Sequence, residues 1–204
     1  MKKVVVIDYD MCNLDSVKRA VEECGGDPVI SNDRKDIEKA ANLILPGVGA
    51  FGKGMDNLTN LGLIEIIKEQ VNAKGIPFLG ICLGMQLLAS VGFEGGLKNG
   101  MNLIPGKVVK LNGVEGLRIP HIGWNEVKFK KDSLLFTNLK DSSDFYFVHS
   151  YHFICEDENN ILAQTDYDIN FASVVNKDNI FGTQFHPEKS QKAGFQILKN
   201  FISF

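Results

Sequence analysis

The fold of this chain is decided by the stretch Pro77-Phe78-Leu79-Gly80-Ile81-Cys82-Leu83-Gly84-Met85-Gln86. A short apolar run leads to a cysteine that stands between two glycines, and an apolar pattern with helical spacing follows. This order predicts a strand, a sharp turn and the start of a helix, the arrangement called a nucleophile elbow. Glycines suit it because a strained turn needs residues that tolerate a positive φ and leave room for a substrate. The cysteine would then lie beside the first free amides of the helix, which can stabilise an oxyanion.

A buried structural cysteine is the simpler alternative, because cysteine is among the residue types most often found in protein interiors. Gln86 lies four residues after Cys82. On a helix the two side chains therefore share one face, and the Gln86 amide can point at whatever Cys82 attacks. The C-terminal part of the chain decides between the two interpretations.

That part contains Phe181-Gly182-Thr183-Gln184-Phe185-His186-Pro187-Glu188, which predicts a strand ending in a histidine and a carboxylate. Alternation along an extended chain would put His186 and Glu188 on one side. A cysteine nucleophile needs an imidazole to take its proton, and the imidazole needs a carboxylate to set its tautomer. Alone, the pair could be surface residues beside a turn-forming proline. Combined with the elbow, it predicts a catalytic triad of Cys82, His186 and Glu188.

Strands and helices alternate before the elbow, which predicts an α/β fold with a mostly parallel sheet flanked by helices. Ligands of such folds bind beyond the carboxyl ends of the strands. From Gly106 to Phe153 the pattern becomes antiparallel and rich in strands. Before the elbow, we expect strands at Lys3 to Ile7, Pro28 to Ile30 and Leu43 to Leu45, and helices at Asn13 to Glu23, Ile37 to Ala41 and Leu61 to Val71. Near the C-terminus, we expect strands at Ile161 to Thr165, Phe171 to Val175 and Ile180 to Phe185, and a helix from Ser190 to Phe201 that Ser190 caps.

The composition indicates one globular domain. The 204 residues are 44% hydrophobic and 23% charged, with a formal net charge of -3 and no basic block that would favour nucleic acid. The N-terminal apolar run is too short for a signal or a membrane span. The four cysteines have no paired metal spacing, so we expect reduced thiols and a cytoplasmic location. His149 and His152 lack a third ligand nearby, which argues against a metal site.

The elbow from Gly80 to Gln86 and the segment from Gln184 to Glu188 resemble the signature pair of class I (triad) glutamine amidotransferases. Three further stretches resemble the HisH family, the glutaminase subunits of imidazole glycerol phosphate synthase: Pro46-Gly47-Val48-Gly49, Ile104-Pro105-Gly106-Lys107-Val108 and Pro120-His121-Ile122-Gly123-Trp124-Asn125. The similarity runs from Ile7 to the end of the chain. It implies a flavodoxin-like α/β fold of the class I glutamine amidotransferase type, with a single type 1 domain over residues 1–204.

The resemblance also implies an activity and a partner. Cys82 would attack the carboxamide of glutamine, no cofactor would be needed, and the ammonia would pass to a HisF-type (β/α)8 cyclase subunit in a heterodimer. The joint products would be imidazole glycerol phosphate and aminoimidazole carboxamide ribotide, made in histidine biosynthesis. The implied substrate and oxyanion residues are Gly47, Val48, Gly49, Leu83, Gln86, Ser150 and Tyr151. The implied docking residues are Asn13, Pro120, His121, Trp124 and Asn125.

The chain departs from this family at Asp10 and Cys12, where HisH proteins usually carry glycine. Aspartate tolerates a left-handed backbone better than cysteine does, so the loop can differ in shape and affect the fit to a partner. A second acceptor therefore stays open, because HisH-like paralogues also supply ammonia to enzymes that amidate surface-polysaccharide sugars. A noncatalytic binding protein and a cysteine peptidase of similar topology are further alternatives. The intact triad argues against the first, and Gln86 with the glycine-rich loop argues against the second.

Overall fold

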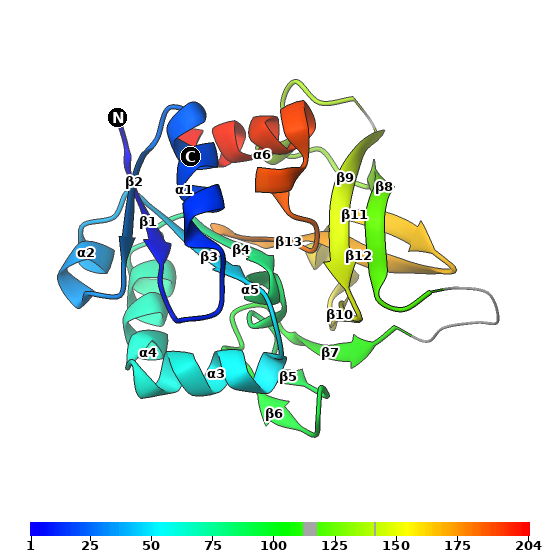
Figure 1. Cartoon of the computed structure of the whole chain (residues 1–204), viewed down its shortest axis with the longest axis horizontal. Helices are drawn as coiled ribbons and strands as arrows, with labels where there is room; N and C mark the ends of the chain where they lie inside the picture. The colour runs from blue at the N-terminus through cyan, green and yellow to red at the C-terminus, as the bar shows by residue number, and fades with distance from the viewer. Residues whose placement is uncertain (112–117, 141) are drawn as a thin grey trace.

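The computed structural model describes residues 1–111, 118–140 and 142–204. Within these residues, nine strands form one mixed sheet in the spatial order β2-β1-β3-β4-β13-β12-β11-β8-β9 (Figure 1). The first five are parallel and the last four join by antiparallel pairs. In chain order they are β1 (Lys3–Ile7), β2 (Asp27–Ser31), β3 (Asn42–Gly47), β4 (Phe78–Cys82), β8 (His121–Phe129), β9 (Ser142–His149), β11 (Ile161–Tyr167), β12 (Ile169–Lys177) and β13 (Ile180–Thr183).

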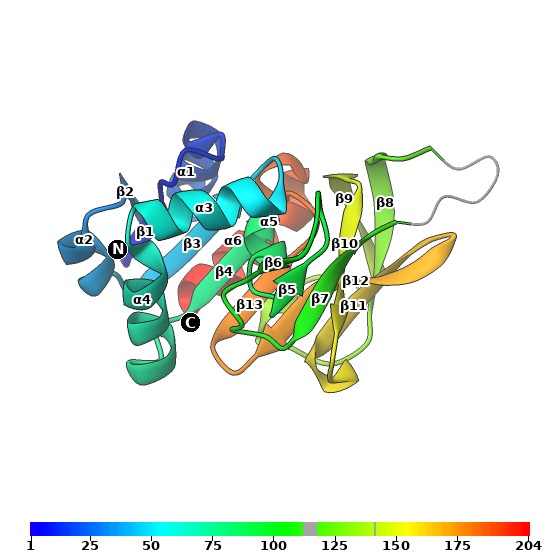
Figure 2. The same ribbon diagram turned by 90° about the horizontal axis from the view of Figure 1, so that it is seen from below.

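Helices cover both faces of the parallel half, as the alternating pattern predicts. Helices α1 and α6 lie on one face, and α3 and α4 lie on the face that Figure 2 brings forward. The helices are α1 (Leu14–Glu23), α2 (Arg34–Glu38), α3 (Phe51–Asn60), α4 (Leu63–Lys68), α5 (Leu83–Gln86) and α6 (Gln191–Ser203). A π-helical turn, Glu69–Ala73, extends α4, and short 3-10 turns span Leu134–Phe136, Glu158–Asn160 and Pro187–Lys189.

A second, smaller sheet packs beside the main one. Its order is β10-β7-β5-β6, built from β5 (Val91–Gly92), β6 (Lys98–Asn99), β7 (Gly106–Lys110) and β10 (Tyr151–Cys155). The chain leaves β9 at His149 and enters β10 at Tyr151, so only one residue separates the two sheets there. This junction carries the segment predicted to hold glutamine.

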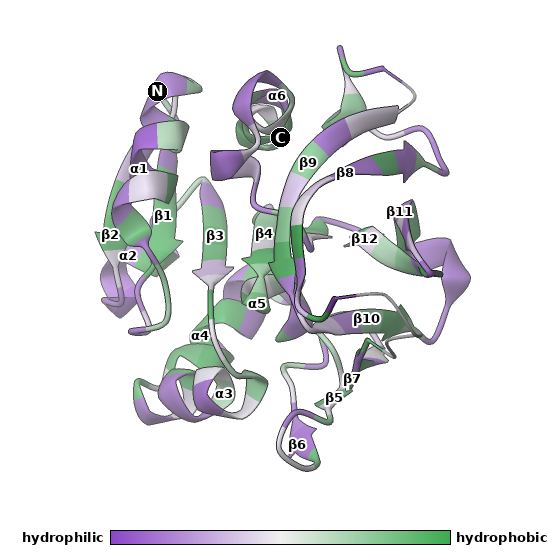
Figure 3. Cartoon of the chain, turned by 45° about the vertical axis from the view of Figure 1, so that its right-hand side comes forward, coloured by the Kyte–Doolittle hydropathy of each residue, from purple (hydrophilic) through white to green (hydrophobic). Residues whose placement is uncertain are grey.

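The apolar run of β1 explains why the sheet has two cores. Successive side chains of a strand point to opposite faces. Val4 and Val6 accordingly join the cluster that contains α1 and α6 side chains, whereas Val5 and Ile7 join the cluster that contains α3 and α4 side chains. Figure 3 shows β1 and β4 in hydrophobic colours between these helix layers. A continuous β-branched run is thus the signature of a strand buried on both faces.

Several predicted elements are displaced in the structure. The helix expected from Leu61 to Val71 begins two residues later, at Leu63, because Gly62 before it has a φ of 65°, and it continues through the π-helical turn to Ala73. Helix α3 before it was not predicted. The helix expected near Ile37 to Ala41 starts earlier and ends at Glu38. The stretch Pro120 to Asn125, which lacks a clear pattern, mostly forms the start of β8. Tertiary pairing with β9 imposes this conformation, overriding a weak local preference.

Ser190 stands at the N-cap position, directly before the C-terminal helix, but its side chain does not cap the helix. Its hydroxyl donates to the carbonyl oxygen of His186 at 2.6 Å and accepts from the amide of Tyr146 at 3.0 Å. The predicted cap is therefore wrong in its bonding, because these two contacts tie the histidine turn to β9. None of the helices in the described ranges is both long and apolar enough to cross a membrane.

Candidate active site

Cys82 occupies the predicted elbow between β4 and α5. Its backbone has φ 53° and ψ -108°, a conformation that few non-glycine residues adopt and that structures keep mainly at functional positions. A Cβ at Gly84 would collide with the carbonyl oxygen of Leu45, and one at Gly80 would lie 2.6 Å from the backbone of Gly84. The two glycines thus allow the elbow to pack tightly against β3 and against itself.

The Cys82 sulfur lies in a polar surrounding although the residue is almost fully buried. The Gln184 side-chain nitrogen lies 3.7 Å from it, and the sulfur lies 3.9 Å from the Val148 carbonyl oxygen. Two polar groups thus face the sulfur, which an apolar packing environment would not provide.

His186 and Glu188 form a close pair at the end of the neighbouring strand β13. The Nδ1 atom of His186 lies 2.8 Å from Oε1 of Glu188, and both side chains are at most 5% exposed. The contact does not arise from strand alternation, because β13 ends at Thr183 and His186 begins the 3-10 turn Pro187–Lys189. The predicted pair is present, but a turn brings it together.

The electrostatics of His186 favour the imidazolium form. Burial lowers its pKa, but the nearby Cys82 sulfur and the Glu188 carboxylate, both of which favour the charged ring, outweigh burial and raise the pKa to about 10. Its Nε2 atom makes no hydrogen bond to any described residue within the usual distance limits. Such contacts commonly tighten only when substrate is bound, so Nε2 is available to exchange a proton with Cys82.

A cavity of about 370 Å³ opens in front of Cys82. It is lined by six of the predicted substrate residues, Val48, Gly49, Leu83, Gln86, Ser150 and Tyr151, together with Ala50, Cys82, Glu94, Pro120, Val148 and His149. Gly47 does not line the cavity. It is buried on β3, where it pairs in register with Cys82 of β4.

Glu94 is the residue that sequence reasoning missed. It lies in the excursion between β5 and β6, which was assigned no role, and its carboxylate accepts a hydrogen bond from the Phe51 amide at 2.7 Å. That bond fixes the carboxylate at the rim of the cavity. A carboxylate in this place can bind an ammonium group. No local signal in a glycine-rich loop marks such a residue, since only the fold brings it to Cys82.

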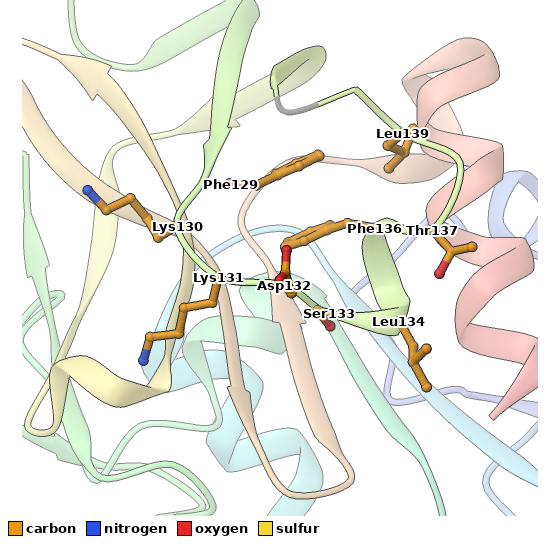
Figure 4. A pocket seen from close by; sticks show the side chains of 9 residues that line it. All are labelled: Phe129, Lys130, Lys131, Asp132, Ser133, Leu134, Phe136, Thr137 and Leu139. Carbon is orange, nitrogen blue, oxygen red and sulfur yellow. The ribbon is translucent and has the colours of Figure 1, made fainter.

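A larger cavity of about 890 Å³ lies elsewhere, along the segment from Phe129 to Leu139 (Figure 4). Phe129 and Phe136 stack at 3.9 Å in it, while Lys130 and Lys131 extend away from the rings. None of the predicted site residues lines it. Size alone therefore does not identify the functional site.

The side-chain nitrogen of Gln86 holds the segment of Ser150 and Tyr151, which is predicted to bind glutamine. Its Nε2 atom donates to the Tyr151 carbonyl oxygen at 3.0 Å and to Gln184 Oε1 at 3.1 Å. Gln184 in turn points its own nitrogen at the Cys82 sulfur. The Gln86 nitrogen thus links the nucleophile to the start of β10. Gln86 also lines the cavity, so the expectation that its amide faces the attacked group stays a prediction, now limited to the amide oxygen.

Two buried histidines support the same segment from the other side. Nδ1 of His149 lies 2.8 Å from the Tyr151 carbonyl oxygen, so this nitrogen carries the proton. Nε2 of His149 then accepts from Nδ1 of His121 at 3.0 Å, and Nε2 of His121 accepts from Asn125 at 3.3 Å. Burial lowers the pKa of His121 to about 4 and that of His149 to about 3, so both rings are neutral at pH 7. A single tautomer satisfies each ring.

The glycine-rich loop after β3 is not yet arranged for an oxyanion. The Val48 amide donates to the Met11 carbonyl oxygen at 2.6 Å, so it is not available to a group bound at Cys82. Met11 lies in the loop with the unusual Asp10, whose φ of 61° is the left-handed value that aspartate tolerates. Cys12, by contrast, does not adopt a positive φ.

The predicted docking residues divide into exposed and buried ones. Trp124 is 49% exposed and its neighbour Ile122 is 59% exposed, and Asn13 and Pro120 are also exposed. His121 is only 3% exposed and lies between the rings of Phe147 and Tyr167. It therefore cannot contact a partner directly, because the alternation of β8 turns it inward, and it supports the exposed residues instead.

No group of three His, Cys, Asp or Glu side chains within the described ranges is arranged to hold a metal ion. All four cysteines, Cys12, Cys24, Cys82 and Cys155, are free thiols.

Comparison with known proteins agrees with this geometry. Residues 5–203 match the family model described as glutamine amidotransferase class-I. The chain is 51% identical to imidazole glycerol phosphate synthase subunit HisH 2 of Methanococcus maripaludis, with 98% of each chain covered. It is 48% identical to subunit HisH 1 of Campylobacter jejuni, again over 98% of each chain. It is also 48% identical to subunit HisH of Aquifex aeolicus, over 98% of this chain and 95% of that one.

Solved structures share the fold at lower identity. A structure of PurLQS from Thermotoga maritima matches with a TM-score of 0.76 at 20% identity, covering 100% of this chain and 99% of that chain. A putative GMP synthase subunit from Thermoplasma acidophilum matches with a TM-score of 0.73 at 23% identity, covering 100% and 93%. At these identities the likeness concerns the arrangement of strands and helices.

Proposed function

Because this chain belongs to the class-I glutamine amidotransferase family, we propose that it is the glutaminase subunit of an imidazole glycerol phosphate synthase. It hydrolyses glutamine to glutamate and ammonia, and passes the ammonia to a HisF-type (β/α)8 cyclase in a heterodimer. One observation carries the chemistry: the strained Cys82 lines a cavity of small-ligand size, and the buried pair of His186 and Glu188 follows the adjacent strand β13, close enough for Cys82 to raise the pKa of His186. The names of the nearly full-length relatives support the choice of acceptor.

The reaction follows from the charges of the triad. The Cys82 thiolate, paired with the His186 imidazolium, attacks the side-chain carbonyl carbon of glutamine and forms a carbon–sulfur bond. The carbon–nitrogen bond then breaks while His186 donates its proton to the leaving ammonia. Water adds to the thioester, His186 takes a proton from it, and glutamate leaves with Cys82 restored. Glu188 keeps the imidazole in one tautomer and stabilises its positive charge throughout.

The cavity supplies groups for both ends of glutamine. Ser150 and Tyr151 bind the α-amino and α-carboxyl groups, and Gln86 and His149 hold the Tyr151 carbonyl oxygen in place. Glu94 adds a carboxylate for the ammonium group. Leu83 offers its backbone amide to the oxyanion from the first turn of α5.

The second oxyanion donor is the Val48 amide, which must first leave Met11. We infer that the peptide between Gly47 and Val48 turns over, which the absence of a side chain at Gly47 allows. The free subunit is therefore a weak glutaminase until this turn is made. Docking of the cyclase against the exposed residues Trp124, Pro120 and Asn13 favours the turned form, since Pro120 lines the cavity and Asn13 lies two residues from Met11, which holds the Val48 amide.

Replacement of the nucleophile tests the chemistry. Cys82→Ala is expected to fold with the thermal midpoint of the parent and to lose about four orders of magnitude or more in glutamine hydrolysis. Cys24→Ala, a half-buried thiol whose sulfur donates to Phe195 O, is the matched control and keeps its activity. Near-parental activity in Cys82→Ala would show that the assignment is wrong.

Addition of a cyclase tests the acceptor. Glutamine hydrolysis is measured with the chain alone, and then with a HisF-type cyclase and its ribonucleotide substrate. A large increase on adding both supports the histidine pathway. If the rate of glutamine hydrolysis is the same with and without the cyclase, the chain is still a glutaminase, but the HisF-type cyclase is not its partner.

A second acceptor, a surface-polysaccharide sugar amidotransferase, is favoured by one observation. Two of the relatives carry a numeral, HisH 2 and HisH 1, which indicates more than one such subunit in those organisms. A second copy is free to serve another enzyme.

The four free thiols support the predicted cytoplasmic location, where thiols stay reduced. A single domain over residues 1–204 stays a prediction.

A further inference from the structure

Tyr9, two residues after the end of β1, carries a buried hydroxyl that the reaction above does not use. The residue is 0% exposed, and within the described part of the chain its oxygen has no hydrogen-bond partner. Burial, followed by negative charge at Cys12 and Cys82, raises the Tyr9 pKa well above its ordinary value. The hydroxyl therefore stays protonated and remains a donor without an acceptor.

The hydroxyl is packed against the backbone that must move. It is the nearest atom to the place where a Cβ of Gly47 would lie, ahead of Leu83 Cβ at 2.9 Å and Gly84 N at 3.2 Å. Gly47 is the strand residue in register with Cys82. The Tyr9 oxygen thus lies against the Gly47 α-carbon, directly behind the nucleophile.

A turn of the peptide between Gly47 and Val48 would create the missing acceptor. The N–H and C=O groups of a peptide point in opposite directions. When the Val48 N–H leaves Met11 O for the oxyanion, the Gly47 carbonyl must swing toward the Met11 loop. There the Gly47 carbonyl lies near the Met11 carbonyl oxygen, which cannot donate a hydrogen bond. Because the Gly47 carbonyl is buried, it needs a hydrogen-bond donor from elsewhere in the protein. Tyr9 begins the same loop two residues before Met11.

We propose that Tyr9 is a positioning residue whose hydroxyl donates to the Gly47 carbonyl in the turned peptide and thereby holds the Val48 amide toward the oxyanion. This inference rests on the proposed glutaminase function. The Tyr9 hydroxyl replaces the hydrogen bond that Val48 gives up, so the turned and resting forms differ less in free energy. In the resting form the buried hydroxyl is unpaired, which raises the free energy of that form. The free-energy difference between the resting and the turned form becomes smaller for this reason as well.

Tyr9→Phe tests the proposal because it removes only the oxygen and keeps the ring in the core. The matched control is Thr165→Val, which removes another fully buried hydroxyl with no partner in the described ranges, on β11 and outside the cavity. Four quantities are measured for each variant: kcat for glutamine, KM for glutamine, the thermal midpoint, and the rate at which iodoacetamide alkylates Cys82, which is followed by peptide mass spectrometry. Alkylation needs no oxyanion, so it reports the nucleophile alone.

We expect kcat of Tyr9→Phe to fall about three- to tenfold, the equivalent of one neutral hydrogen bond, with KM and the alkylation rate unchanged. Its thermal midpoint should equal or exceed that of the parent, because an unpaired hydroxyl has been removed. Thr165→Val should keep the parental kcat. A purely structural role would lower kcat and the midpoint together.

Three results would overturn the proposal. Parental kcat in Tyr9→Phe would mean that the hydroxyl plays no part in the turn. A lowered thermal midpoint would mean that the hydroxyl is already bonded in the resting protein. If the parent itself hydrolyses no glutamine, alone or with a cyclase, the proposed function fails and this inference fails with it.

Discussion

Replacing Glu188 by glutamine removes one charge from the triad and changes little else. Glutamine has the size of glutamate, and its side-chain oxygen can still accept the hydrogen bond from His186 Nδ1, which lies 2.8 Å from Glu188 Oε1. The two side chains are 3% and 5% exposed, so solvent does little to screen the pair. Two unit charges about 4 Å apart attract by about 4 kcal/mol at an effective dielectric constant of about 20.

The neutral bond that remains recovers about 1 kcal/mol, which leaves a net loss of about 2–4 kcal/mol for the imidazolium. At about 1.4 kcal/mol per pKa unit, the pKa of His186 falls by about 1.5–3 units from its value of about 10. His186 then loses its proton at about pH 7–8.5, where the parent keeps it.

Two measurements detect this change. The alkaline limb of kcat/KM for glutamine should move down by about 1.5–3 pH units in Glu188→Gln, because the leaving ammonia needs the His186 proton. Unfolding by urea gives the second. The folded pKa of His186 exceeds its unfolded value of about 6.5, so its contribution to stability is complete below pH 6.5 and is lost as the pH rises through 10. The variant should lose less stability than the parent between pH 6.5 and 10.

Glu156→Gln, which neutralises an exposed glutamate, is the control and should match the parent in both measurements. An alkaline limb of Glu188→Gln that coincides with the parent's to within about half a unit would refute the argument. The Glu188 charge would then not be what raises the pKa of His186.

Three further changes follow from the site. Glu94→Gln keeps an acceptor for the Phe51 amide but loses the charge, so KM for glutamine should rise about tenfold or more with kcat nearly unchanged; a kcat loss at constant KM would contradict this role. Trp124→Ala should weaken binding to a HisF-type cyclase about tenfold or more while thermal unfolding stays parental, and unchanged affinity and ammonia transfer would remove the claim. Gly84→Ala places a Cβ on the Leu45 carbonyl oxygen and should cost about 1–3 kcal/mol or more in urea unfolding; parental stability would mean that the elbow is loosely packed.

Much of the fold was predictable because its signals are local. The β-branched run from Lys3 to Ile7 marks a strand buried on both faces, and the structure distributes its side chains between two cores. The elbow around Cys82 was predictable for a similar reason, since glycine on each side of a nucleophile answers a steric need within five residues. Helix α3 was missed because Gly52 and Gly54 weaken its helical signal, although Phe51, Met55 and Leu58 bury one face.

The sequence by itself determined the chemical groups of this protein and their order along the chain: a cysteine at a strained turn, then a histidine and a carboxylate after a late strand. Only the tertiary structure decided how they meet. The contact of His186 with Glu188 depends on a 3-10 turn and not on strand alternation, and Glu94 reaches the cavity from a loop without a pattern. The commitment of the Val48 amide to Met11 and the unpaired hydroxyl of Tyr9 are likewise invisible in the sequence. Local patterns report backbone preference and burial, whereas hydrogen bonds between residues distant in the chain depend on the packed fold.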